Sequence, residues 1–108
     1  MANPPRIWLS NETPEKGEIV RVRAQVVHIM ESGLRLDEAG QPIPRDTLTR
    51  FEARLGEDLI LDWLPETAIS QNPYIEFTFK ARQSGVLKMV WTDQRGIVAE
   101  ADRQLTLS

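Results

Sequence analysis

Two segments in which apolar and polar residues alternate strictly lie within residues 70–96 of this chain of 108 residues, joined by a Ser-Gly turn. One phase of the first segment holds Ile75, Phe77, Phe79 and Ala81, and one phase of the second holds Leu87, Met89 and Trp91. A period of two is typical of a strand with one buried face, because successive side chains point to opposite sides of a sheet. The run therefore predicts two consecutive strands that each contribute one face to a core.

Alternation of the same kind predicts strands over residues 18–28, 48–55 and 58–64, and a final strand is predicted over residues 97–107. The short apolar segment of residues 6–9 predicts an edge strand. About seven strands with almost no helical period are typical of an antiparallel β-sandwich of immunoglobulin-like type. A small closed barrel is the alternative, because strand number alone does not separate the two. We expect an all-β single domain over residues 1–108, with an inward-facing set that comprises Val22, Val26, Phe51, Leu61, Phe77, Phe79, Met89 and Trp91.

Residues 30–46 interrupt this pattern, since they carry two Gly, two Pro and no period. A connection of this length without secondary structure of its own is uncommon in a compact domain. Such loops tend to be functional or mobile. The segment is therefore a candidate binding element.

The composition excludes several classes of function. The chain has no cysteine, which excludes disulfides and thiol chemistry, and its net charge of −3 comes without the basic stripe that nucleic-acid binders carry. It has one histidine, His28, and a metal site there would need several carboxylates that converge on it, which nothing in the spacing indicates. His28 shares the phase of Val26, so we expect a hydrogen-bonded histidine at a strand end. No catalytic residue, cofactor or metal site is predicted.

Four short pieces resemble a known family in this order and spacing: residues 28–35, 43–45, 70–74 and 90–96. They resemble the SoxZ family, and the resemblance extends from residue 6 to residue 107. It implies the cysteine-free, non-catalytic half of the sulfur-compound carrier complex of thiosulfate oxidation. The implied partner is a SoxY-like subunit, whose C-terminal cysteine arm carries the sulfur intermediates; other sulfur-oxidation enzymes would act through the complex.

The expected location depends on whether the residues or the resemblance is used. The first ten residues do not show the cationic start and apolar core of a secretory signal peptide, and by itself the sequence predicts a cytoplasmic protein. The resemblance implies instead a periplasmic protein that is exported together with a signal-bearing partner.

Two regions are candidates for a partner interface. Ile60, Val90 and Val98 are apolar residues in the outward phase, and they would form one patch if their strands were neighbours. Arg35 and Arg45, in the loop of residues 30–46, are the other candidate anchors.

Two other functions are alternatives to pairing with a carrier subunit. A small hydrolase or sulfur-transfer enzyme would need a nucleophile and base at a suitable spacing, and none is visible. A free-standing immunoglobulin-like binding or adhesion module would predict aromatic residues that face solvent, whereas Trp63 and Trp91 lie in the core phase.

Overall fold

The computed structural model describes residues 5–28, 30–31, 33–64 and 72–108. These residues form strands β1 (Arg6–Leu9), β2 (Ile19–Gln25), β3 (Leu48–Leu55), β4 (Asp58–Trp63), β5 (Tyr74–Lys80), β6 (Gly85–Asp93) and β7 (Gly96–Leu105). The described residues include no helix. Accordingly, no helix among them is long and apolar enough to cross a membrane.

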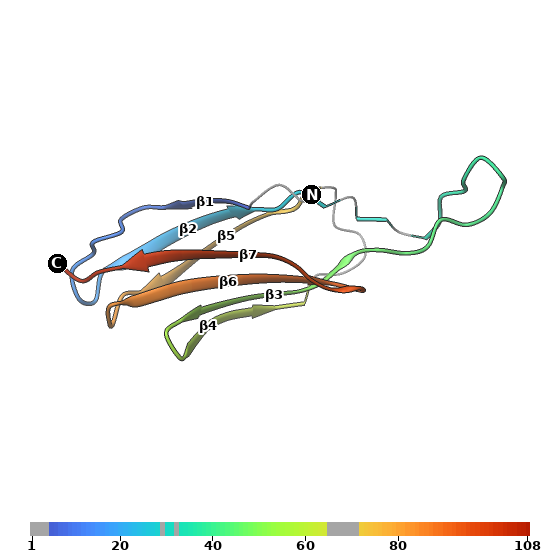
Figure 1. The fold of residues 1–108 in the computed structure, drawn as a ribbon. Coiled ribbons are helices and arrows are strands. Elements are labelled where there is room, and N and C mark those ends of the chain that lie inside the picture. Colours follow the sequence, from blue (N-terminus) through green and yellow to red (C-terminus); the bar gives the residue numbers. More distant parts are fainter. Residues whose placement is uncertain (1–4, 29, 32, 65–71) are drawn as a thin grey trace.

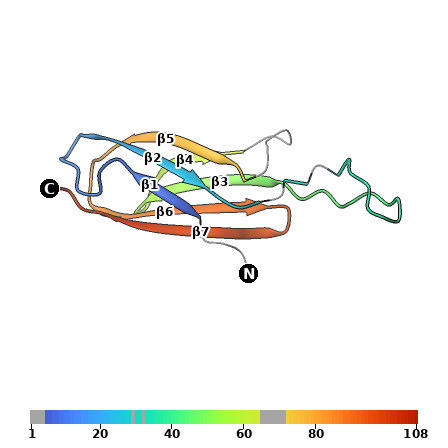
Figure 2. The ribbon, with the colours of Figure 1, turned by 90° about the horizontal axis from the view of Figure 1, so that it is seen from above.

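The strands form two antiparallel sheets that face each other (Figures 1 and 2). One sheet has three strands in the order β1-β2-β5, and the other has four in the order β4-β3-β6-β7. Two packed antiparallel sheets with no strand shared between them are a β-sandwich, so the immunoglobulin-like class predicted from the alternation is confirmed and the closed barrel is not observed.

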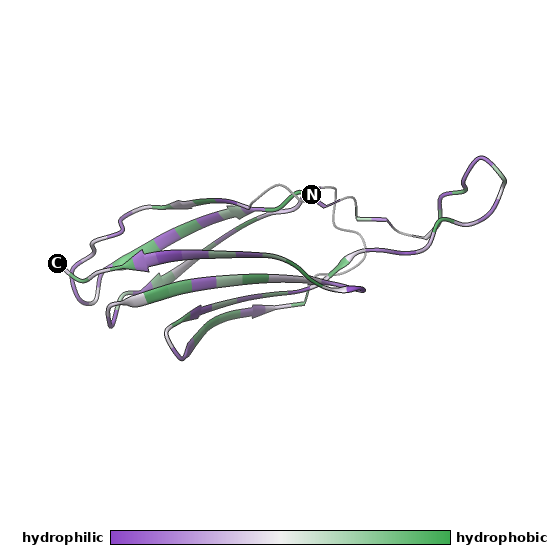
Figure 3. Cartoon of the chain, in the orientation of Figure 1, coloured by the Kyte–Doolittle hydropathy of each residue, from purple (hydrophilic) through white to green (hydrophobic). Residues whose placement is uncertain are grey.

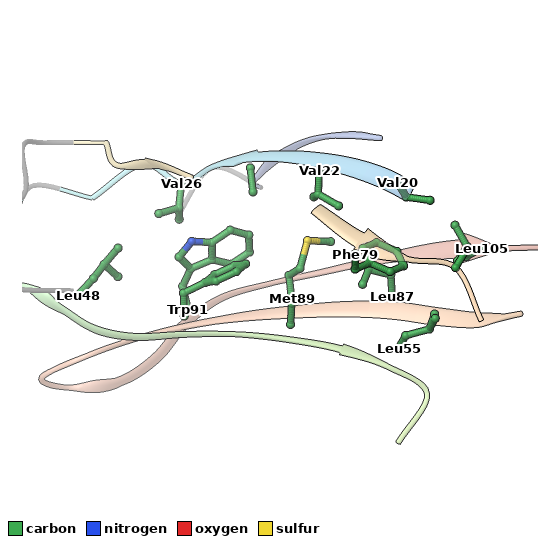
Figure 4. Close-up of a cluster of buried hydrophobic side chains, with 14 of the residues drawn as sticks. Val20, Val22, Val26, Leu48, Leu55, Phe79, Leu87, Met89, Trp91 and Leu105 are labelled. Carbon is green, nitrogen blue, oxygen red and sulfur yellow. The ribbon is translucent and has the colours of Figure 1, made fainter. Parts of the chain in front are cut away.

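The core lies between the two sheets, and every residue predicted to face inward belongs to it or packs against it. Figure 3 shows the alternation of hydrophobic and hydrophilic residues along the strands that produces this arrangement. In Figure 4, Val20 and Val22 of β2, and Val26 just after it, point toward Leu87, Met89 and Trp91 of β6. The Trp91 ring lies 4.9 Å from the ring of Phe51, which in turn lies 5.9 Å from Phe77 across the sandwich. Aromatic pairs of this kind stabilise the fold by more than the burial of their apolar area alone.

Two β-bulges explain why the outward orientation predicted for Ile60 and Val98 is wrong. The β3–β4 register shifts between Ala53 and Arg54, and the β6–β7 register shifts between Trp91 and Thr92, which leaves Ile60 and Val98 as the extra residues. A bulge interrupts alternation, so the side chains on either side of it need not follow a period of two. Ile60 and Val98 pack against the core and do not point outward as predicted, whereas Val90 remains half-buried on the outer face.

Residues 33–45, which we call the arm, extend beyond one end of the two sheets (Figures 1 and 2). With the arm, the molecule measures 58 × 24 × 20 Å. The predicted patternless loop therefore has a definite place in the fold.

Candidate functional site at the root of the arm

The arm is a narrow two-stranded ribbon. Leu36 pairs with Pro42, and the Ile43 N–H donates to the Arg35 carbonyl at 2.9 Å. At the tip, Asp37 Oδ1 accepts the N–H groups of Ala39 and Gln41, each at 2.9 Å. An aspartate that caps local N–H groups is a common way to order a turn. The sequence pattern did not reveal the local hydrogen bonds of the arm. Neither side of this ribbon packs on the core, so burial does not impose an alternation of apolar and polar residues on it.

Gly33 lets the two sides of the arm approach each other closely. Its φ is +85°, and a Cβ at this position would meet the Cβ of Arg45 at 3.2 Å. Both observations favour glycine, because other residues rarely adopt such a φ and the neighbouring atom belongs to the other side of the ribbon. Arg45, a predicted interface residue, therefore lies directly at the base of the arm.

Arg35, the second predicted anchor, is bound by Glu31. Glu31 belongs to the root of the arm, by which we mean the residues just before and after residues 33–45 together with the side chains that they contact. The Nη2 of Arg35 lies 2.6 Å from Oε1 of Glu31, whose own N–H donates to the Asp46 carbonyl at 2.7 Å. The hydrogen bond to Glu31 raises the pKa of the Arg35 guanidinium above its usual value. The Arg35 side chain is still 71% exposed, so part of the guanidinium remains accessible to a partner.

Below the arm, three buried side chains and one exposed arginine form a cluster that joins separate segments of the chain. His28 Nε2 lies 3.1 Å from Asp93 Oδ2 and 3.7 Å from Asp46 Oδ1. The guanidinium of Arg95 pairs with the other oxygen of Asp46, and the Arg95 N–H donates to Asp93 Oδ1 at 2.7 Å. Because these four residues come from the segments before and after the arm and from the β6–β7 turn, the cluster fixes the root of the arm to the sandwich.

Both ring nitrogens of His28 have defined neighbours. The Met30 N–H donates to Nδ1 at 3.0 Å, so Nδ1 is the acceptor and we assign the ring proton to Nε2, where it points at Asp93. The predicted hydrogen bond between His28 and the backbone is confirmed, but its predicted place at a strand end is wrong, because β2 ends at Gln25. With one nitrogen accepting and the other donating, the ring is arranged to hold structure together and has no nitrogen left over to act as a base on a substrate.

Asn72 adds a second connection to His28, through the backbone. Its side-chain Oδ1 accepts the His28 N–H at 2.9 Å, and its own N–H donates to the His28 carbonyl at 2.9 Å. Asn72 has a φ of 50°, a conformation that asparagine adopts more readily than most residues. Sequence pieces separated by more than 40 residues thus meet through a reciprocal pair of hydrogen bonds.

His28, Asp46 and Asp93 are also the residues that could hold a metal ion, because one ligand atom from each lies within 4.8 Å of the others. Carboxylates do converge on His28, contrary to the expectation from sequence spacing. The arrangement fits a cation poorly, since Arg95 already supplies a positive charge to Asp46 and the Nε2 proton of His28 points at Asp93. Asp46 Oδ1 nevertheless has no hydrogen-bond partner among the described residues.

The four family-like pieces of sequence converge at this root. His28 and Glu31 come from the first piece, Arg45 from the second, Asn72 from the third, and Asp93 and Arg95 from the fourth. The fourth piece ends in the turn that joins β6 to β7, and Asn72 and Pro73 of the third piece directly precede β5. Their shared contacts with the first piece could not be predicted, because no local pattern indicates a partner 44 or 65 residues away.

The outer-face candidates do not form one patch. Strand β3 lies between Ile60 on β4 and Val90 on β6. Val98 lies on β7, next to β6, but packs against the core, so it does not join Val90 on the outer face. Val90 sits in a shallow hollow of about 380 Å³ with Arg50, Glu52, Lys88 and Glu100 on its rim. A contact of Ile60, Val90 or Val98 with a partner stays a prediction.

Acid should weaken the root through Asp93. Burial acts to raise the pKa of the Asp93 carboxyl, but the hydrogen bonds from His28 and from the Arg95 N–H outweigh it and hold that pKa below the ordinary value of 3.8. A lowered pKa in the folded state stabilises the fold above the ordinary value, and this stabilisation is lost as the pH falls through the lowered one. We expect the carboxyl carbon of Asp93, followed by NMR, to titrate below 3.8; a midpoint above that value would contradict the geometry.

Comparison with protein families identifies the chain. Residues 9–104 match the sequence profile of the family described as Sulphur oxidation protein SoxZ. The chain belongs to the SoxZ family. Members of this family take part in sulfur oxidation. A role in sulfur oxidation, which the resemblance implied, is therefore supported for this chain. No curated protein sequence matches the chain.

Solved structures show the same fold as this SoxZ-family chain. SoxY, the sulfur carrier protein from Chlorobium limicola f thiosulfatophilum, has a TM-score of 0.64 at 13% identity, with 99% of this chain and 81% of SoxY covered. Superoxide reductase (neelaredoxin) from Ignicoccus hospitalis has a TM-score of 0.67 at 16% identity, with 99% of this chain and 82% of the reductase covered. At these identities the similarity concerns the fold alone.

Proposed function

We propose that this chain is the non-catalytic subunit of a sulfur-compound carrier complex and pairs with a SoxY-like subunit. The observation that carries the proposal is the family match over residues 9–104 in a chain that has no cysteine. A chain without a thiol has no group on which to carry a sulfur intermediate as a thiol adduct. Its contribution would be to support the partner that does, and to help present that partner's arm to the enzymes that act on it.

We propose further that the arm is a principal contact with the SoxY-like subunit. Leu34 and Leu36 lie on it with 88% and 61% of their surface exposed, and Arg35 lies between them. Apolar surface on a projecting segment is stabilised when a partner covers it, by roughly 25 cal/mol per Å² before the costs of association. The hydrogen-bonded root supports this role, because an arm held in place loses little freedom on binding.

Paired variants should distinguish the arm from the outer face of the larger sheet. We expect Leu34→Asp to weaken the binding of a SoxY-like subunit from the same organism by about tenfold or more, because a carboxylate would have to be desolvated at an apolar contact. Titration calorimetry provides the affinity and circular dichroism the check on folding. Val90→Glu is the matched variant on the outer face.

The outcomes of this comparison separate the two locations. A loss of affinity with Leu34→Asp supports the arm, and a further loss with Val90→Glu would extend the interface to the outer face. A loss confined to Val90→Glu would place the interface on the outer face and contradict the arm. Absence of any binding by the wild-type chain would contradict the pairing itself.

The purified chain alone should not consume thiosulfate. The expectation follows from the missing thiol and from the engaged nitrogens of His28. Thiosulfate consumption is measured with the wild-type chain and with His28→Ala against buffer. Consumption above buffer that His28→Ala abolishes would contradict the non-catalytic role.

We propose that the chain is located in the periplasm and that it is exported while bound to the carrier subunit. The proposal follows from the pairing and from nothing in the fold. Cell fractionation after expression with and without a signal-bearing SoxY-like subunit tests it, and export of this chain without that subunit would contradict it.

A further inference from the structure

The outer face of the smaller sheet carries a set of residues that neither the family match nor the arm explains. Strand pairing places Trp8, Arg23 and Glu76 in one row across β1, β2 and β5, and Arg6, Gln25 and Tyr74 in the next row. Trp8 is 47% exposed and Tyr74 is 55% exposed. We call the surface formed by these two rows the Trp8–Tyr74 face.

The Trp8–Tyr74 face is built from the residue types that dominate protein interfaces. Trp, Tyr and Arg are enriched among the residues that contribute most to binding. The Arg23 guanidinium lies 4.6 Å from the centre of the Trp8 ring, and its Nε lies 3.4 Å from Glu76. Arg23 is therefore already positioned before a partner arrives, which reduces the entropy lost on binding.

The charge of this face differs from that of the whole chain. Four cationic side chains and a single carboxylate, that of Glu76, point outward from β1, β2 and β5: the cations are Arg6, Arg21, Arg23 and Lys80. The chain as a whole has a net charge of −3. Arg6 and Lys80 form no ion pair with the described residues. A positive surface on an acidic protein favours a partner of opposite charge.

The outer face of the larger sheet provides the contrast. There Arg50 pairs with both Asp62 and Glu52 at 2.7 Å, and Arg54 pairs with Glu52 at 2.7 Å. Lys88 lies 3.8 Å from Glu100. Because its cations are neutralised by its own carboxylates, that face offers much less charge to an acidic partner.

A shallow hollow lies between the two aromatic residues. It has a volume of about 240 Å³, and its walls include Arg6, Trp8, Arg23, Gln25 and Tyr74. Guanidinium groups bind carboxylates through paired hydrogen bonds, and the aromatic rings supply apolar area beside them. A carboxylate side chain flanked by apolar neighbours fits this lining.

We propose that the Trp8–Tyr74 face docks an acidic segment of a protein partner, with one carboxylate side chain in the hollow between Trp8 and Tyr74. Glu76 favours a protein over a nucleic acid or an acidic polysaccharide. It lies 3.4 Å from both Arg21 and Arg23, in the middle of the positive surface, where it repels a polymer with a charge on every unit. A protein segment can place an uncharged or basic residue there. The proposal goes beyond pairing with a carrier subunit and does not depend on it.

The test uses the isolated full chain and two synthetic decapeptides. One alternates Glu with Ser around a central Leu, and the other has Gln in place of every Glu; binding is followed by chemical-shift changes in the ¹⁵N-labelled chain. We expect saturable changes confined to the Trp8–Tyr74 face, and about tenfold weaker binding of the Gln peptide, the effect of losing one charge-assisted hydrogen bond. Trp8→Ala and Arg23→Ala should each weaken binding of the Glu peptide by about tenfold.

Lys88→Ala, on the outer face of the larger sheet, is the matched control and should leave binding unchanged. Arg23→Gln replaces either variant that fails to fold, because it keeps hydrogen-bonding capacity while it removes the charge. Equal binding of the two peptides, changes centred on Lys88, or no saturable binding would overturn the proposal. Tighter binding of an oligothymidylate or of heparin than of the Glu peptide, at about 0.15 M salt, would also overturn it and assign the face to a polyanion.

Discussion

Trp91→Ala should lower the free energy of unfolding by about 3–5 kcal/mol, which is a large part of the stability of a domain of this size. Trp91 is among the largest fully buried side chains, it lies between the two sheets (Figure 4), and its ring is 4.9 Å from that of Phe51. Its removal leaves a cavity that a sandwich of two sheets cannot close without moving whole strands. Urea denaturation followed by circular dichroism measures the loss.

Val86→Ala serves as the control for Trp91→Ala. Val86 lies on the same strand, β6, and 43% of its surface is exposed, so the substitution should change the free energy of unfolding by well under 1 kcal/mol. A loss for Trp91→Ala no larger than that of Val86→Ala would show that the β6 side chains have the opposite phase to the one described.

His28→Ala should have the second-largest effect, a loss of about 3 kcal/mol, because a buried charged group loses its hydrogen-bond donor. The substitution removes the hydrogen-bond donor to Asp93, whose side chain is 1% exposed, and leaves that buried carboxylate oxygen without it. It also removes the acceptor of the Met30 N–H. Thermal and urea unfolding of the variant provide the measurement.

His28→Gln is the conservative comparison. Its side-chain amide can donate a hydrogen bond in place of the ring, so part of the stability should return. Full stability in His28→Ala would contradict a structural role for the cluster. Because the cluster holds the root of the arm, faster hydrogen exchange of residues 33–45 in His28→Ala is expected as well, whereas a histidine that contributes only local packing would leave the arm unchanged.

The strands were predictable because burial imposes a period of two on them. The bounds of β1 and β3 agree with the predicted segments, and the phase of Phe77, Phe79, Met89 and Trp91 is the observed one. Strand β2 ends at Gln25, earlier than predicted, because the chain leaves the sheet to bring His28 to Asn72 and Asp93. Alternation continues through Val26, which is buried although it lies outside the strand.

The bulges and the root of the arm were not predictable from local pattern. Ile60 and Val98 alternate with their neighbours in the sequence, and only the register between strands reveals that each is an extra residue. The contacts of His28 with Asp93 and Asp46 require the fold, since the three residues come from different segments. Their convergence could have been suspected only from the positions of the four family-like pieces.

The aromatic residues that face solvent were missed for a different reason. Trp63 and Trp91 are predicted to face the core, to which both do contribute, and residues 6–9 are predicted to be an apolar edge strand. In a four-residue strand, alternation is too short to separate Trp8 from Ile7 and Leu9. Tyr74 begins β5 in the phase of Glu76, so its exposure followed from the same alternation that placed Phe77 in the core.

Hydrogen–deuterium exchange of this chain, alone and with a SoxY-like subunit, tests the central claim of pairing through the arm. We predict that residues 33–45 exchange more slowly in the mixture, and that His28→Ala, which loosens the root, reduces this protection. The outer face of β3 and β6 is the internal comparison, because it contains Val90. Unchanged exchange in the arm, with protection elsewhere or nowhere, would contradict the account.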